Sequence, residues 1–166
     1  MILSTGIAEK IDIERAVDAC LRQGNKDLTL LKCTSSYPAP IEEANLSMIK
    51  DLADRFNVIS GLSDHTLGST VPILAVAFGA KIIEKHFIID RSIGGPDASF
   101  SMNEEEFTEM VKAIRQAERA IGEIDYTLTH KQRKGKDFSR SLYVVSNIEK
   151  TIHSIRAAVD ETKNAI

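Results

Sequence analysis

The chain has 166 residues, of which 43% are hydrophobic and 27% charged, and its net charge is −3. This length suits one domain with its own core, and the composition is ordinary for a soluble globular protein. The small negative charge argues against nucleic acid or an anionic membrane as a partner. The sequence contains no run of 18 apolar residues, which a membrane span would require. Residues 1–3 lack the basic region of a signal peptide. Buried, reduced thiols are expected at Cys20 and Cys33, which favours a cytoplasmic location.

Apolar patterns of two different periods alternate along the first 122 residues. Short apolar runs predict strands over residues 1–4, 28–33, 58–62 and 81–83. Helical spacing predicts helices over residues 13–23, 46–56, 71–78 and 104–121. In the same order, the residues expected to cap their N-termini are Asp12, Asn45, Ser69 or Thr70, and a capping box at 101–104. Four strands that alternate with four helices predict an α/β domain with a parallel sheet.

The last part of the chain has a different character. Residues 123–140 are polar and basic, and we interpret them as a solvated linker. Residues 141–145 are expected to form one more short strand. The tail from residue 147 to the end is mildly amphipathic and has no clear partner within the chain.

Two histidines stand where predicted strands end. Because side chains alternate along a strand, Ser63 shares a face with His65, and Glu84 shares a face with His86. Ligands bind at the carboxyl ends of parallel strands, and two imidazoles beside a carboxylate suit a divalent transition metal with open positions. The alternative is two unrelated histidines, each hydrogen-bonded to the backbone.

Two loops add polar groups to the same edge of the predicted sheet. The hydroxyls of residues 34–37 could hold a phosphate or a sugar, although a plain turn with local hydrogen bonds is the alternative. The Gly-Gly-Pro-Asp turn at 94–97 presents Asp97 near its apex, and a simple turn aspartate is the alternative there.

Four motifs in order resemble the sialic acid synthase family. They are LLKCTSSYPAP at 30–40, GLSDHTLG at 61–68, IEKHF at 83–87 and GGPD at 94–97. The resemblance covers roughly residues 1–146. Within the family, GGPDASFS at 94–101 and SLYVV at 141–145 are most similar to the pseudaminic acid synthase branch.

The resemblance implies a partial TIM (β/α)₈ barrel of about four βα units plus a C-terminal linker. Residues 1–122 would be the second half of the barrel, and residues 123–166 a linker and tail toward an antifreeze-like domain outside this chain. Family members condense phosphoenolpyruvate with an N-acylated amino sugar to give a nine-carbon 2-keto sugar acid and phosphate. The family's catalytic base, a phosphate-binding lysine and an arginine of the second domain have no counterpart here, so the isolated chain is expected to be inactive or nearly so.

The resemblance also assigns roles to single residues. Its candidate catalytic residues are Glu84, His65 and His86, and the two histidines would bind a divalent metal, Mn²⁺ in the first place and Mg²⁺ or Co²⁺ as alternatives. The expected substrate-binding residues are Ser4, Ser35 and Ser63 for phosphoenolpyruvate, and Tyr37 and Asp97 for the sugar. A homodimer is expected. Two alternatives stay open: a non-catalytic half-barrel that packs or oligomerises, and another keto-acid synthase that uses phosphoenolpyruvate.

Overall fold

The computed structural model describes residues 1–141 and residue 143. The chain divides into two compact units, Met1–Glu123 and Ile124–Ile166. The tail from residue 147 lies outside the described residues, and so does most of the strand expected at 141–145.

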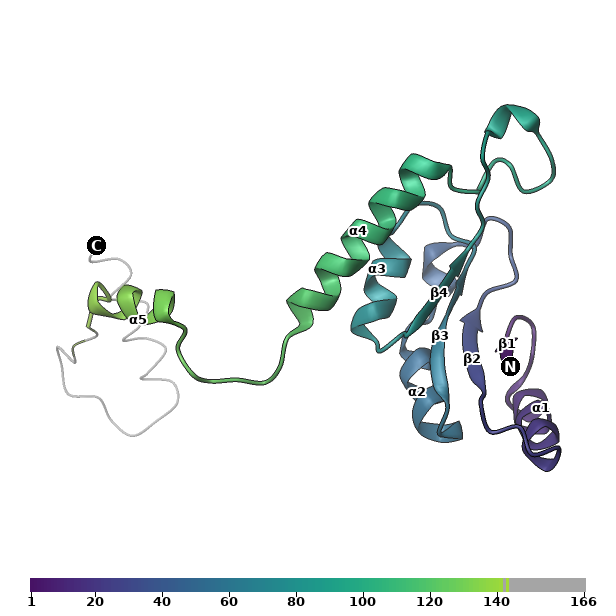
Figure 1. Ribbon diagram of the computed structural model, residues 1–166, viewed down its shortest axis with the longest axis horizontal. Helices are drawn as coiled ribbons and strands as arrows, with labels where there is room; N and C mark the ends of the chain where they lie inside the picture. Colours follow the sequence, from purple (N-terminus) through teal and green to yellow (C-terminus); the bar gives the residue numbers. More distant parts are fainter. Residues whose placement is uncertain (142, 144–166) are drawn as a thin grey trace. The chain divides into compact units, whose positions relative to one another are not determined.

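The first unit is built on a parallel sheet (Figure 1). Its strands are β1 (Ile2–Ser4), β2 (Thr29–Cys33), β3 (Ile59–Asp64) and β4 (Ile82–Lys85), in the order β1-β2-β3-β4. Every neighbouring pair is parallel. All five residues of β2 are buried, as expected of a central strand in such a sheet. The prediction of an α/β domain with a parallel sheet is confirmed.

Helices connect these strands and follow the last one. They are α1 (Lys10–Arg22), α2 (Ser47–Phe56), α3 (Thr70–Ala77) and α4 (Glu104–Ile121), with short 3₁₀ turns at Ile41–Glu43 and Arg91–Ile93. Glycines mark two of the predicted ends: Gly79 and Gly122 have φ of +96° and +57°, a region that side chains with a Cβ rarely enter. In the part of the chain that is described, no helix combines the length and apolarity that a membrane span requires.

The first two helices begin differently from the prediction. Asp12 is not the N-cap of α1, because the N-cap is Glu9, three residues earlier, with which Asp12 forms a capping box. Asn45 is not a side-chain cap either. It adopts a left-handed φ of +44° and its carbonyl accepts from the backbone of Met48. In both places the path of the chain into the helix, rather than the residue type, determines the cap.

The next two helices show the same effect. Ser69 precedes α3 as expected, but its side chain makes no capping hydrogen bond. The capping box of α4 is formed by Asn103 and Glu106, two residues beyond the box predicted to start at Ser101. Asn103 Oδ1 accepts from the backbone N–H of Glu106, and Glu106 Oε2 accepts from that of Asn103.

The described part of the second unit contains one more helix, α5 (His130–Asp137). It lies within the segment that we interpret as a linker. Its start is a capping box, in which Thr129 Oγ1 accepts from the backbone of Gln132 and Gln132 Oε1 accepts from that of Thr129. The residues of this capping box can be recognised in the sequence, but the polar residues around them hide the helix from a prediction based on apolar spacing.

The core of the first unit lies between the helices and one face of the sheet. Leu30 packs among buried residues of α1 and α2, and Leu62 packs among those of α2 and α3. Ile83 contacts the cluster that α3 forms with α4. Since side chains alternate, the neighbours of these residues on each strand point to the opposite face, and the candidate site lies there.

Candidate functional site

A row of polar side chains crosses the sheet on the face away from the helices. Cys33, Ser63 and Glu84 are in register on β2, β3 and β4. The Ser63 hydroxyl donates to Glu84 Oε1 over 2.7 Å. Ser63 is buried and Glu84 is exposed, so the serine fixes a carboxylate at the open rim of the sheet. Cys33 is buried as predicted, whereas Cys20 is only half-buried, and both are free thiols.

The two histidines lie directly beyond β3 and β4. The centroids of the His65 and His86 rings are 5.2 Å apart, and the ring planes meet at 63°. His65 is buried, whereas His86 is partly exposed. Strands 21 residues apart in the sequence thus bring the two imidazoles together at one edge of the sheet.

His65 is oriented by the backbone of the neighbouring strand end. Its Nδ1 lies 2.9 Å from the carbonyl oxygen of Thr34. An imidazole that donates through Nδ1 keeps the lone pair of Nε2 free for a ligand or a proton. The sequence alone points to the histidine but not to Thr34, because the partner is a main-chain atom 31 residues away.

Thr34 is itself held by a buried lysine. Lys32 Nζ donates to the carbonyl of Cys33 over 2.8 Å and to Thr34 Oγ1 over 3.0 Å. Thr34 Oγ1 donates in turn to the carbonyl of Glu43. Burial lowers the pKa of Lys32, because the ammonium loses its hydration, and the nearby Cys33 and Glu43 oppose this shift. These contacts fix the loop that follows β2.

His86 is held on its other side by the loop of residues 88–101. Its Nδ1 lies 3.6 Å from Asp97 Oδ2, and its carbonyl accepts from the backbone N–H of Met102. The carbonyl of Asp97 accepts from Ser101 Oγ over 2.7 Å. The loop therefore folds back so that Asp97 faces the histidine pair, although half of the Asp97 side chain stays exposed.

Two aromatic side chains lie beside the histidine pair. The Tyr37 ring centroid is 4.2 Å from that of His65 and 5.9 Å from that of His86. The Phe100 ring centroid is 5.0 Å from that of His86. Phe100 was not among the predicted site residues, because a lone phenylalanine in a loop carries no chemical signal.

Three of the remaining predicted residues share a neighbouring hollow. Ser4, Ser35 and Tyr37 line a cavity of about 550 Å³ between the ends of β1 and β2. The loop after β1 is tied to β2, because Thr5 Oγ1 accepts from the backbone N–H of Cys33. Tyr37 belongs both to this hollow and to the histidine pair, so the predicted residues form one continuous surface.

The donor set limits which metal could bind. Among the described residues, no group of three or more histidine, cysteine, aspartate or glutamate side chains is arranged to hold an ion. His65 and His86 therefore fit an ion that takes its other ligands from water or substrate, and they do not fit a closed structural zinc site. The hydrogen bond from His65 to a carbonyl is typical of a metal-binding imidazole.

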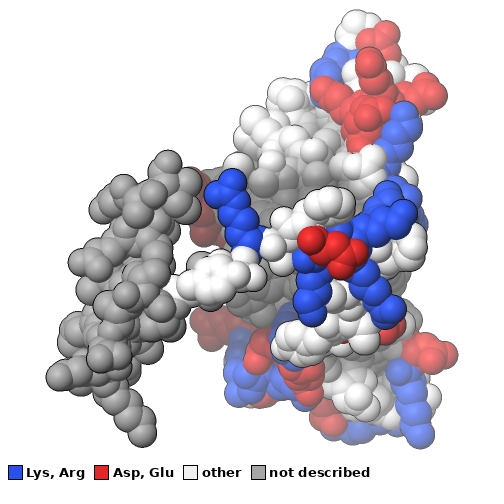
Figure 2. Space-filling view, turned by 90° about the vertical axis from the view of Figure 1, so that its left-hand side faces the viewer, with Lys and Arg blue, Asp and Glu red and all other residues white. Residues whose placement is uncertain are grey.

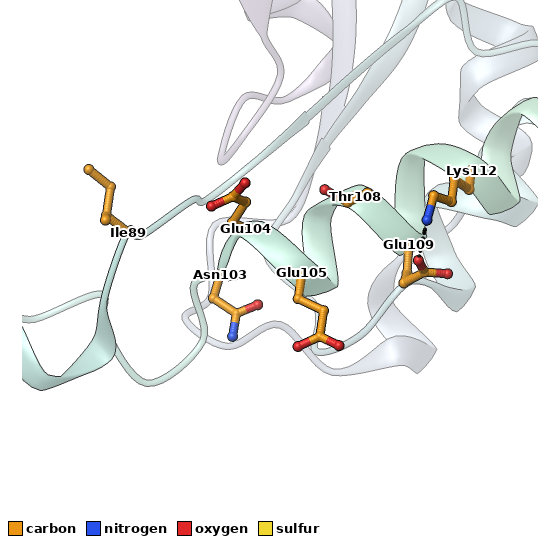
Figure 3. Close-up of a pocket in the computed structure, with 7 residues that line it drawn as sticks. All are labelled: Ile89, Asn103, Glu104, Glu105, Thr108, Glu109 and Lys112. Atoms are coloured by element: carbon orange, nitrogen blue, oxygen red, sulfur yellow. Dashed lines mark hydrogen bonds and ion pairs between the residues drawn. The ribbon is translucent and has the colours of Figure 1, made fainter.

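A separate hollow of about 450 Å³ lies beside the first half of α4 (Figure 3). Its carboxylates belong to Glu104, Glu105 and Glu109, and Glu109 pairs with Lys112 over 2.7 Å. None of the predicted site residues lines it. The face drawn in Figure 2 carries both basic and acidic side chains.

These features define a parallel α/β domain with a histidine pair at the carboxyl ends of adjacent strands. Residues 1–126 match the model of the NeuB family, and the chain belongs to this family. The resemblance to the sialic acid synthases is therefore confirmed. Pseudaminic acid synthase of Helicobacter pylori is 47% identical over 151 residues, which cover 90% of this chain and 44% of that protein. N,N'-diacetyllegionaminic acid synthase of Legionella pneumophila is 44% identical over 126 residues, or 74% of this chain and 35% of that protein.

Solved structures agree with these similarities. N-acetylneuraminic acid synthetase of Leptospira borgpetersenii, crystallised with citrate, has a TM-score of 0.73 and 34% identity, and the match covers 82% of this chain and 48% of that one. The spore coat polysaccharide biosynthesis protein of Bacillus subtilis has a TM-score of 0.70 and 40% identity, covering 80% and 38%. The chain spans less than half the length of these relatives.

Proposed function

We propose that this chain forms the metal-binding half of a pseudaminic or sialic acid synthase. The reaction would be the condensation of phosphoenolpyruvate with an N-acylated amino sugar to give a nine-carbon 2-keto sugar acid. The observation that carries the proposal is the pair of imidazoles, 5.2 Å apart at the edge of the sheet. The 47% identity to the pseudaminic acid synthase of Helicobacter pylori supports this product class.

We also propose that the four βα units are the second half of a (β/α)₈ barrel. All the strands are parallel, and β1 and β4 stand at the two edges of the sheet. The helices that form the core pack on one face, as in a barrel wall. Residues 123–166 would then be the linker and tail toward a further domain.

The site residues divide the work by their chemistry. His65 and His86 would hold Mn²⁺, or Mg²⁺ or Co²⁺ in its place, and the ion would polarise the sugar aldehyde. Glu84, fixed by Ser63, is placed to accept a proton or a hydrogen bond at the rim. Asp97 is a hydrogen-bond acceptor for sugar hydroxyls beside His86.

The hollow beside the histidines suits the second substrate. The hydroxyls of Ser4 and Ser35 are donors for the carboxylate or phosphate of phosphoenolpyruvate. The Tyr37 ring lies between this hollow and His65, where it would contact the sugar. We further propose a homodimer, and a cytoplasmic location that agrees with the two free thiols.

Mn²⁺ binding tests the metal assignment directly. Titration of the chain with Mn²⁺, followed by electron paramagnetic resonance, is expected to show binding that His65→Ala or His86→Ala abolishes. His130→Ala is the matched control, because His130 is exposed on α5 in the other unit, and it should bind as the parent does. Equal binding by all variants would show that the metal assignment is wrong.

A second candidate function is a non-catalytic half-barrel that packs or oligomerises. The exposed apolar side chain of Ile2 on the edge strand β1, which is 56% accessible, favours it. The chain should therefore be assayed alone and mixed with the N-terminal half of the Helicobacter pylori relative. Keto-acid formation only in the mixture supports the synthase, whereas a stable complex without product supports the non-catalytic fragment.

Mass spectrometry of the product, with several N-acylated sugars offered, separates this synthase from others that use phosphoenolpyruvate.

A further inference from the structure

A buried ion pair joins the two strands that carry the histidines. Asp64 and Lys85 are the last residues of β3 and β4 and are partners in the sheet register. Their side chains are 2% and 1% exposed, and Lys85 Nζ lies 2.6 Å from Asp64 Oδ2. Each residue directly precedes one histidine of the candidate site. The pair therefore lies on the helix side of the sheet, immediately behind the two imidazoles.

The ion pair is also hydrogen-bonded to Thr66, the residue that follows His65. Lys85 Nζ donates to the carbonyl of Thr66 over 2.6 Å. The two carboxylate oxygens of Asp64 accept from the backbone N–H and the hydroxyl of Thr66. Asp64 and Thr66, the residues on either side of His65, are thus both bonded to Lys85, which directly precedes His86. The backbone at the two histidines therefore cannot move independently.

Stability alone does not explain such a pair. Removing two charges from water costs about as much as their attraction returns, and apolar replacements of similar volume are often neutral or stabilising. A pair with this cost is best explained by the geometry that it imposes. The exposed pair of Lys50 with Asp54, by contrast, connects two residues of one helix, α2, and cannot align two strands.

We propose that Asp64 and Lys85 are positioning residues that set the separation of the His65 and His86 rings. The proposal deepens the proposed function and rests on its metal site. The pair does not touch the ion or the substrates. It acts through the backbone, by locking the ends of β3 and β4 in register, so that two ring nitrogens reach one ion.

The test replaces both charges by side chains of similar size. Asp64→Asn combined with Lys85→Met leaves no unpaired charge, and the thermal unfolding midpoint should stay within a few degrees of the parent. Mn²⁺ affinity should fall about 10- to 100-fold, the range found when groups that orient metal ligands are lost. The control is Asp54→Asn with Lys50→Met, which makes the same changes on an exposed surface and should leave both quantities unchanged.

Thr66→Val is a second variant, which removes one bond to Asp64 and keeps the ion pair. It should lower Mn²⁺ affinity about threefold, and it decides the question if the double variant does not fold. Parent-like affinity in Thr66→Val, or in a folded double variant, overturns the positioning role while the proposed function stands. If the parent itself does not bind Mn²⁺, or binds it without His65, the proposed function fails and this inference fails with it.

Discussion

Gly61 lies in β3 at a position that leaves no room for a side chain. A Cβ built there would lie 2.3 Å from the carbonyl oxygen of Ile82 on β4 and 2.7 Å from Leu31 Cδ2 on β2. Both neighbours belong to adjacent strands, and the closer one is a backbone atom that cannot rotate away. Gly61→Ala must therefore push β3 and β4 apart.

The size of the effect follows from these distances. An ordinary contact of this kind is 3.4 Å or longer, so the strands must separate by about 1 Å. A ladder hydrogen bond of about 2.9 Å would then stretch to about 4 Å and be lost. Two such bonds at about 1 kcal/mol each, with about 1 kcal/mol of overpacking strain, predict a loss of about 3 kcal/mol in the free energy of unfolding.

Urea denaturation followed by circular dichroism measures this loss. Gly135→Ala is the control, since a Cβ at that position in α5 meets nothing within 4 Å and lies in the other unit. The control should leave the unfolding of the first unit unchanged. An unfolding free energy for Gly61→Ala within about 0.5 kcal/mol of the parent would refute the reasoning, because it would mean that β3 and β4 are not as closely apposed as the structure shows.

Two further predictions concern the start of α4. Asn103→Ala should lower the free energy of unfolding by about 1 kcal/mol, because it removes a capping box. Ser69→Ala at the start of α3 should change this free energy by less than about 0.5 kcal/mol, since Ser69 makes no capping bond. Chemical denaturation of the two variants measures both changes. Hydrogen bonds from Arg91 and from the backbone of Asn103 hold the pKa of Glu106 below its ordinary value, so Glu106 stabilises the fold at neutral pH and loses this effect as the pH falls through the lowered pKa. Glu106→Gln should therefore flatten the acid side of a stability profile measured from pH 7 to pH 3, and an unchanged profile would contradict the assignment.

The family motifs and the order of strands and helices can be predicted from the sequence. Hydrophobic periodicity is a local property, and the glycines that end helices α3 and α4 act within a few residues. The placing of Ser63, His65, Glu84 and His86 on one face also follows, because alternation along a strand is a matter of counting. The helix starts are harder, since a cap depends on the direction in which the chain enters the helix.

The contacts that build the site were decided by the tertiary structure. His65 bonds to a backbone carbonyl 31 residues away, and Asp64 pairs with Lys85 across 21 residues. Neither partner carries a signal of its own, because any lysine or any carbonyl would look the same in the sequence. Only the register of β2, β3 and β4 selects these partners, and that register depends on how all the buried side chains of the sheet pack together.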